Sequence, residues 1–382
     1  MQIKKNKIFV FLLILFHFFF CAINAVTKES LIGPYGVYYE LVVFSILIFN
    51  SYFFGYLKKN YLLYLFVFFF IMLFFAKISS YKNDLSYLFF DTIMFSNFYF
   101  LLISLRKKLF DNSFLMFFIF SSIIILSNII LLSNSSFYDN DRFLGLMYNV
   151  NQNVYLVGFC LIYIHYFAQK FQNFRLTIIM VDIFLLLLSV LFLYYSYSRS
   201  CILIVLFFIV SILRLRYKSI FVILFLFIYS ASFFSISINY LDFGRLFDPD
   251  DPSILTRINL QTDFIEGSAN SFLMPHGPNS ATIYVKNVTN RDEFHLHNDF
   301  LAYLFNYGFI FIAYLFLIIR ILSSITKKSP LKNIIVFLFY FSSLFHGYLF
   351  SFFISIPLMF VLSLIINNDE IILIRTKRVS LT

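Results

Sequence analysis

The chain has 382 residues, of which 61% are hydrophobic and only 13% are charged. A chain this apolar does not stay in solution, so the composition excludes soluble enzymes and predicts a polytopic membrane protein. The formal net charge of +10 would suit a nucleic-acid-binding protein, but the basic residues are spread over short segments at regular intervals, which is typical of membrane topology and not of a nucleic-acid surface.

The apolar segments are continuous and about twice as long as the strands of a transmembrane barrel, so they predict helices and an all-α integral membrane protein. We expect about 12 transmembrane helices, at 8–26, 37–56, 61–78, 86–104, 114–133, 153–169, 175–195, 200–213, 219–238, 298–319, 333–348 and 351–367.

The first expected helix has the basic start and apolar core of a signal peptide. Ile23 is a poor fit to the small-x-small pattern of a cleavage site, so we expect this helix to be retained. A cleaved signal peptide is the alternative, and the topology of the following helices is the same in both cases.

Lysine and arginine residues alternate between the two sides of the expected bundle. One side carries Lys58, Lys59, Arg106, Lys107, Lys108, Lys170, Arg175, Arg214, Arg216, Lys218, Lys327, Lys328, Lys332, Arg375, Lys377 and Arg378. The short segments on the other side carry only Lys28, Lys82, Arg142 and Arg199. Since positive charge stays in the cytoplasm, this bias puts both termini inside. It predicts nine helices over 1–238, a large periplasmic loop over 239–296, and three helices with a short cytoplasmic tail over 297–382.

Arginines on the outer side are candidates for binding a phosphate-bearing substrate, because guanidinium binds phosphate oxygens bidentately and stays charged. Arg199 lies between two expected helices, in Ser198-Arg199-Ser200. The plain alternative is an arginine that reaches toward lipid headgroups.

Arg257 and Arg142 are the other two candidates. Arg257 lies in the large loop, where Asp251 and Ser253 are capping-type residues and 258–265 favours an interfacial helix. Arg142 lies in a short outer segment. A solvated arginine is the alternative reading at both positions.

A polar segment ends at His295 and His297, and an apolar run to Ile319 follows at once, so His297 is expected at the membrane surface. Its imidazole would be largely neutral at pH 7 and suited to act as a general base. An interfacial surface histidine is the alternative, and His295 is a competing base.

These residues resemble the signature of a known group of enzymes. The pattern His297-Asn298, nine residues, then Gly308 resembles that of the O-antigen ligase and O-antigen polymerase superfamily, bacterial membrane enzymes that transfer glycans from a polyprenyl-diphosphate lipid. Further matching elements, in chain order, are Arg142 with Gly145, Asn149 and Asn151, then Ser198-Arg199-Ser200, Arg257, and a Gly-bearing turn at 274–279. Phe311 departs from the small residue or tyrosine of many ligases, which weakens assignment to the ligase branch.

The resemblance implies a membrane glycosyltransferase of the bacterial inner membrane, with its active site facing the periplasm. By this resemblance the catalytic residues are His297, Arg199 and Arg257, and the substrate-binding residues are Arg142, Asn298, Ser198, Ser200 and His295. No cofactor or metal is expected. The donor would be an undecaprenyl-diphosphate-linked glycan, and the resemblance allows for a chain-length regulator as a partner, beside the membrane lipids.

The acceptor separates two activities within the superfamily. A polymerase would extend another lipid-linked repeat unit, whereas a ligase would transfer to the lipid A-core of lipopolysaccharide. The 59 phenylalanines and 27 tyrosines indicate AT-rich coding, which is typical of exchanged polysaccharide gene clusters, so we favour the polymerase.

Other interpretations fit the sequence less well. A polysaccharide flippase would line an aqueous path with charged residues, but the expected helices hold few besides Glu40, Asp91 and Asp182. A purely structural subunit would not need a large loop with outward arginines. A metal site at 248–251 would use carboxylates, but its prolines favour a solvated acidic turn. The three cysteines are expected to pack as small hydrophobic residues.

Overall fold

The structure is a computed structural model of the whole chain. It describes residues 2–28, 36–53, 85–139, 142–171, 175–196, 198, 201–202, 204–205, 207–209, 263–266, 273–289, 299–326 and 355–366. The long helices are α1 (Gln2–Thr27), α2 (Gly36–Phe53), α4 (Leu85–Arg106), α5 (Phe114–Leu131), α6 (Val150–Phe171), α7 (Arg175–Ser196) and α13 (Phe309–Thr326). Shorter elements are η1 (Asp111–Ser113), η2 (Ser135–Phe137), β1 (Tyr138–Asp139), β2 (Arg142–Phe143), η3 (Gly145–Met147), α11 (Ser280–Thr289), α12 (Asp299–Tyr307) and an apolar helix at Ser355–Ile366.

The described part is mostly helical, as the apolar segments predicted. Four of its helices are long and apolar enough to cross a membrane, namely Ile8–Thr27, Tyr87–Arg106, Phe114–Leu131 and Leu176–Ser196. The expected helices at 61–78, 219–238 and 333–348 lie outside the described residues, so the count of 12 stays a prediction.

One expected helix is interrupted. The apolar run over 298–319 predicted a single helix, but the structure ends α12 at Tyr307 and starts α13 at Phe309. Gly308 separates them with a φ of 51°, a left-handed conformation that breaks a right-handed helix.

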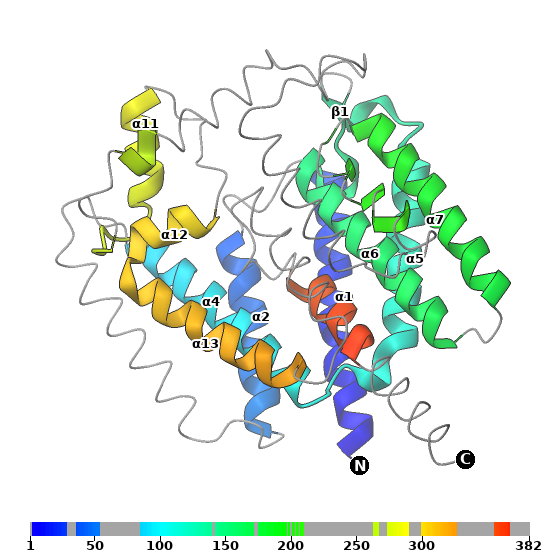
Figure 1. Cartoon of the computed structure of the whole chain (residues 1–382), viewed down its shortest axis with the longest axis horizontal. Helices are drawn as coiled ribbons and strands as arrows, with labels where there is room; N and C mark the ends of the chain where they lie inside the picture. Colours follow the sequence, from blue (N-terminus) through cyan, green and yellow to red (C-terminus); the bar gives the residue numbers. More distant parts are fainter. Residues whose placement is uncertain are drawn as a thin grey trace.

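The helices form two groups around a shared centre (Figure 1). On one side α6 packs between α5 and α7, and on the other side α4 packs against α2 and α13. The first helix, α1, joins the groups through contacts with α2, α5 and η3. Large aromatic residues fill the interior, including Phe98, Phe117, Tyr155, Phe159 and Tyr163, each less than 2% exposed.

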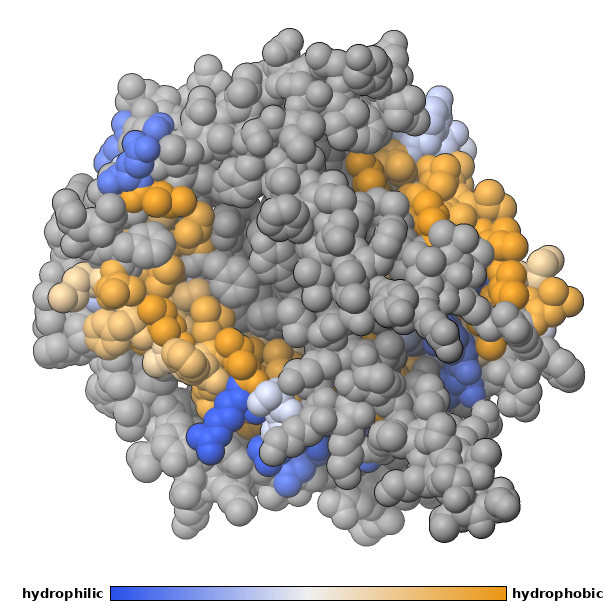
Figure 2. Space-filling model, viewed as in Figure 1, coloured by the Kyte–Doolittle hydropathy of each residue, from blue (hydrophilic) through white to orange (hydrophobic). Residues whose placement is uncertain are grey.

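The outward flanks of the bundle are apolar, as a lipid-facing surface requires. Figure 2 shows apolar side chains over α7 and α13, with hydrophilic residues over α11. On α7 the exposed residues include Leu176, Phe184 and Leu187, and on α13 they include Phe316 and Ile319.

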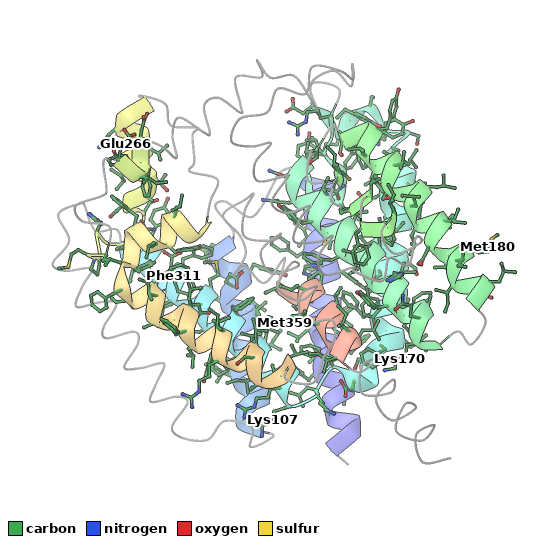
Figure 3. All side chains as sticks on the ribbon, in the orientation of Figure 1. Lys107, Lys170, Met180, Glu266, Phe311 and Met359 are labelled. Carbon is green, nitrogen blue, oxygen red and sulfur yellow. The ribbon has the colours of Figure 1, made fainter. Side chains whose placement is uncertain are left out.

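The two ends of the bundle carry different structural elements. Lys107 and Lys170 lie at one end, and Glu266 lies at the other, with the β1–β2 hairpin and α11 (Figure 3). The end with the hairpin and α11 is the one for which the sequence predicted the outward arginines, and we call it the outer end below.

The acidic residues expected inside helices are buried, and each has a hydrogen-bond partner. Glu40 accepts a hydrogen bond from the side chain of Asn97 at 2.7 Å, and Asp182 contacts the imidazole of His165 at 2.6 Å. Asp91 accepts from the hydroxyl of Tyr307. The three cysteines are also buried, which confirms the expectation that they pack as small hydrophobic residues.

Candidate functional site

Two of the predicted site residues, Arg142 and Ser198, lie in the described part of the chain. The others, Arg199, Ser200, Arg257, His295, His297 and Asn298, lie outside it, as does the acidic segment at 248–251. The described segments that flank them show which parts of the chain are brought together.

Arg142 begins the second strand of a two-residue hairpin. The strands pair antiparallel, with Asp139 opposite Arg142 and Tyr138 opposite Phe143. The Nε of the half-buried Arg142 donates a hydrogen bond of 3.3 Å to the backbone oxygen of Ser196. Ser196 ends α7, where helix carbonyl oxygens lack partners within the helix, so a guanidinium group is well suited to this position.

Ser196 and Ser198 form a compact turn after α7. The backbone N–H of Ser198 donates to the Ser196 hydroxyl oxygen at 3.3 Å, and the N–H of Cys201 donates to the Ser198 carbonyl at 2.9 Å. Ser198 is only 3% exposed, so its hydroxyl is part of the packed interior and is not presented at the surface. The contact between Arg142 and Ser196 therefore places the Arg-x-x-Gly element close to Ser198, the first residue of the Ser-Arg-Ser element.

The backbone conformation and packing at Gly145 explain why the Arg-x-x-Gly element has a glycine at this position. Its φ is 62°, and a Cβ atom there would lie 2.0 Å from Asn153 Nδ2 and 2.5 Å from Asn128 Oδ1. Asn128 Oδ1 accepts a hydrogen bond from the N–H of Leu146 at 3.2 Å, which ties η3 to α5. A side chain at position 145 would displace the loop that carries Arg142.

Asn149 has a local structural role. Its side-chain oxygen accepts a hydrogen bond of 3.2 Å from the N–H of Gln152, in the first turn of α6. The asparagine that was matched to the superfamily pattern therefore caps a helix here.

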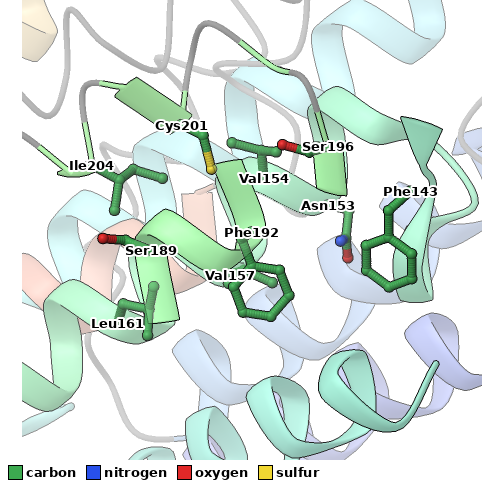
Figure 4. Close-up of a pocket in the computed structure, with 10 residues that line it drawn as sticks. All are labelled: Phe143, Asn153, Val154, Val157, Leu161, Ser189, Phe192, Ser196, Cys201 and Ile204. Carbon is green, nitrogen blue, oxygen red and sulfur yellow. The ribbon is translucent and has the colours of Figure 1, made fainter. Parts of the chain in front are cut away.

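A small cavity lies beneath the Ser196 turn (Figure 4). Its volume is about 10 Å³, and its lining includes Phe143, Asn153, Phe192, Ser196 and Cys201. A sugar residue does not fit in this space, so a glycan would lie outside it.

On the membrane-facing flank, a wider groove of about 480 Å³ runs between α5, α6 and α7, and its apolar lining suits the hydrocarbon chains of lipids.

The Gly-bearing turn at 273–279 packs on the end of α12. The N–H of Gly277 donates to the carbonyl of Asn306 at 2.9 Å. His276 Nδ1 bonds to the carbonyl oxygen of Phe305 at 3.0 Å, and the His276 ring stacks on the Phe305 ring with centroids 4.0 Å apart. Asn306 Oδ1 accepts from the N–H of Ala281 at 2.8 Å, so α11 is attached to the same point.

Gly308, the glycine of the His-Asn-x9-Gly pattern, is required at this junction. The N–H of Phe309 donates to the Leu273 carbonyl at 3.0 Å, and a Cβ on Gly308 would lie 2.3 Å from that carbonyl oxygen. The turn element, α12 and Gly308 are thus parts of one packed unit. His276 belongs to the turn that the sequence matched to the superfamily, but its contacts with Phe305 were not predicted.

The segment that follows Arg257 reaches the same unit. Residues 263–266 are helical, in agreement with the end of the helix expected over 258–265, whose earlier residues lie outside the described part, and Phe264 is fully buried. It packs with Ala281 and Val285 of α11 and with Phe305 of α12. Residues close in sequence to Arg257 and to His297 are therefore in direct contact with each other.

Phe311, the departure from the ligase pattern, is accommodated by aromatic neighbours. It is 2% exposed, and its ring lies 6.1 Å from that of Phe95 and 5.6 Å from that of Tyr303. The α4–α13 contact is therefore built around large rings instead of small residues.

Comparison with known proteins adds one match. Residues 184–318 match the family model described as O-antigen ligase. The matched stretch includes Ser198-Arg199-Ser200, the large loop and Gly308, whereas Arg142 and Gly145 lie before it. No curated protein and no solved structure matches the chain.

Proposed function

We propose that this chain, a member of the O-antigen ligase and polymerase superfamily by its match over residues 184–318, is a polymerase of surface polysaccharide. It transfers a glycan from an undecaprenyl-diphosphate-linked donor to a lipid-linked repeat unit. The reaction takes place at the periplasmic face of the bacterial inner membrane, which is the outer end of the bundle.

The chemistry needs a base and groups that neutralise a leaving diphosphate. The oxygen of an acceptor hydroxyl attacks the anomeric carbon, and the bond from that carbon to the diphosphate oxygen breaks. His297 accepts the hydroxyl proton, and the lipid diphosphate leaves with the bonding electron pair. Arg199 and Arg257 stabilise the negative charge that develops on the diphosphate.

The observation that carries this proposal is the packing of Phe264, the 273–279 turn and α12 into one unit. Phe264 follows Arg257 in the sequence and α12 follows His297, so the unit joins segments that come shortly after the two proposed catalytic residues. The unit lies at the same end of the bundle as the Arg142 hairpin (Figure 1). A transferase acting on a membrane-anchored diphosphate requires anion-binding and proton-accepting groups at one membrane surface, and this packing supports placing Arg257 and His297 there in the proposal.

The buried acidic residues argue against a flippase. Glu40, Asp91 and Asp182 are 1%, 6% and 3% exposed, and each has a hydrogen-bond partner inside the bundle. Acidic residues in this environment do not line an aqueous path for a polar glycan.

A ligase is the second candidate, and the description of the matching family favours it. A ligase uses the same donor at the same face, but its acceptor is the lipid A-core. The donor chemistry assigned to His297, Arg199 and Arg257 applies equally to both activities.

A deletion strain tests the choice. If the chain is the polymerase, the strain makes lipopolysaccharide that carries a single repeat unit, because ligation continues. If it is the ligase, the core carries no repeat and lipid-linked polymer accumulates. Normal lipopolysaccharide and normal capsule or other surface polysaccharide in the deletion strain would contradict both.

A further inference from the structure

The carboxyl group of Asp91 is buried, and it has a hydrogen-bond partner at the junction between α12 and α13. It lies in α4, and it accepts a hydrogen bond from the hydroxyl of Tyr307. Tyr307 is the last residue of α12, directly before Gly308. Residues 184–318 carry the family match, so Asp91 lies outside the part of the chain for which the family implies a role.

Cohesion between helices does not by itself explain a carboxyl group here. Neutral groups join the same elements nearby, since the Tyr314 hydroxyl donates to the Phe95 carbonyl at 2.8 Å and the Tyr303 hydroxyl contacts the sulfur of Met94 at 3.9 Å. An ionisable group inside a membrane helix is expensive to bury, and a neutral acceptor would hold a tyrosine hydroxyl at lower cost. An ionised carboxyl group accepts a stronger hydrogen bond than a neutral acceptor does, so aspartate can hold the Tyr307 hydroxyl more firmly than asparagine would.

The hydrogen bond acts on one end of a short, separate helix. α12 has nine residues and is about 13 Å long. The break at Gly308 separates it from α13, so its direction is not fixed by the long helix. Its C-terminal end is held by the 273–277 turn and by Asp91.

Aromatic rings pack closely around the C-terminal end of α12. The ring of Phe95, one helical turn after Asp91, lies 5.0 Å from the ring of Tyr303, 6.0 Å from that of Tyr307 and 4.8 Å from that of Tyr314. Close-packed rings permit little rotation of Tyr307, so a hydrogen bond to its hydroxyl fixes the orientation of the helix that carries it. The other end of α12 begins at Asp299, which follows His297 and Asn298 in the sequence.

We propose that Asp91 is a positioning residue for the transfer reaction. Through Tyr307 it sets the direction of α12, and through α12 it sets the position of the His297-Asn298 element. The proposal rests on the proposed function, because it gives Asp91 a role in presenting the base. It extends the site to the N-terminal half of the chain.

Matched variants of the purified protein test this role. Tyr307→Phe and Asp91→Leu remove the hydrogen bond, whereas Asp91→Asn keeps an acceptor oxygen. Tyr314→Phe is the control, because it removes another buried tyrosine hydroxyl between α13 and α4. Thermal stability, kcat and KM are measured for each with a lipid-linked glycan donor.

We expect Tyr307→Phe and Asp91→Leu to lower kcat at least tenfold while KM changes less than twofold. Their melting temperatures should fall no further than that of Tyr314→Phe, which keeps a kcat near the native value. Asp91→Asn should restore at least a third of the native kcat. If Tyr307→Phe and Tyr314→Phe have the same kcat, the contact is only structural and the proposal is wrong.

A second measurement reports the direction of α12 and does not depend on enzymatic activity. Spin labels at Asp299→Cys and at Met180→Cys, which is on the exposed flank of α7, report the distance between the start of α12 and the opposite helix group. We expect Tyr307→Phe and Asp91→Leu to shift or broaden this distance, and Tyr314→Phe to leave it unchanged. An unchanged distance in Tyr307→Phe overturns the proposal. The proposed function fails in a different way. It is contradicted if the native protein gives a single well-defined spin-label distance but transfers glycan neither to a lipid-linked acceptor nor to lipid A-core. In that case Asp91 has no role in transfer either.

Discussion

The Nε of Arg142 donates a hydrogen bond to the backbone oxygen of Ser196, although 54 residues separate the two in sequence. This contact joins the loop after α5 to the end of α7, two residues before Ser198 in the sequence. Gly145 and Asn128 hold the loop in a shape that permits the contact. An arginine that lies outside the matched family region is thereby made part of the candidate site.

The first prediction concerns this contact. Arg142→Ala should lower the transfer rate about tenfold, because loss of one charged hydrogen bond costs about 1.5 kcal/mol and the turn before Arg199 loses its support. Arg142→Lys should be intermediate, since it keeps the charge but lacks the Nε donor. Transfer is measured in membranes with a lipid-linked donor. Arg320→Ala, an exposed arginine on α13, is the control with no expected effect, and equal rates in Arg142→Ala and Arg320→Ala would contradict the role of the contact.

The second prediction concerns Gly308. Gly308→Ala should destabilise the protein by at least about 1–2 kcal/mol, because alanine is strained in the left-handed conformation, and its Cβ would also meet the Leu273 carbonyl oxygen. Transfer should fall with stability, since the turn and α12 can no longer pack. Gly158→Ala is the matched control, because its Cβ would meet only the flexible end of Ile204. Thermal unfolding in detergent compares the two, and a melting temperature of Gly308→Ala at or above that of Gly158→Ala would be evidence against the requirement.

The positions of the helices could be predicted because each apolar run is both the signal and the cause of a membrane helix. The runs at 86–104, 114–133 and 175–195 coincide with α4, α5 and α7. The break at Gly308 was missed because the apolar residues continue through it, and only the glycine marks the interruption. An apolar run alone does not show whether a glycine inside it is helical.

The contacts between elements could not be predicted from a single sequence. Asp91 and Tyr307 are 216 residues apart, and nothing local to either residue specifies the other. Asn149 shows a related difficulty, since a side chain that matches a family pattern can also be a helix cap, and its sequence position does not show this. Arg199, Arg257 and His297 lie outside the described residues, so their catalytic roles stay predictions.

The third prediction tests those roles. His297→Ala should lower kcat by about 10²–10⁴-fold, the usual contribution of a general base, and it should leave donor binding intact. His295→Ala should have a much smaller effect. Arg199→Lys and Arg257→Lys should each be strongly impaired, since lysine keeps the charge but loses the bidentate geometry for a diphosphate. Turnover by purified variants gives the answer, and near-native turnover in His297→Ala would remove the proposed base.

The fourth prediction concerns orientation in the membrane. Asn287 is exposed on α11 at the outer end, and Lys107 is exposed at the opposite end. Asn287→Cys should react with a membrane-impermeant thiol reagent added from the periplasmic side, whereas Lys107→Cys should react only after the inner membrane is breached. The native cysteines are buried and give little background. The reverse pattern of labelling would invert the proposed topology.

The last prediction concerns the first helix. α1 is packed into the bundle, where His17 Nδ1 bonds to the Tyr39 hydroxyl at 2.9 Å and the Cys21 thiol contacts the Met147 sulfur of η3 at 3.9 Å. Cleavage after Ala25 would remove these contacts and expose the loop that carries Arg142. We therefore expect mass spectrometry of the purified protein to detect peptides that contain Leu13 and Cys21.

His17→Leu should lower stability by about 1–3 kcal/mol, because the buried Tyr39 hydroxyl loses this partner. Phe19→Leu, a change on the exposed side of the same helix, should leave stability nearly unchanged. A mature protein that begins at or after residue 26 would show that the helix is a signal peptide and that the loop is held by other contacts.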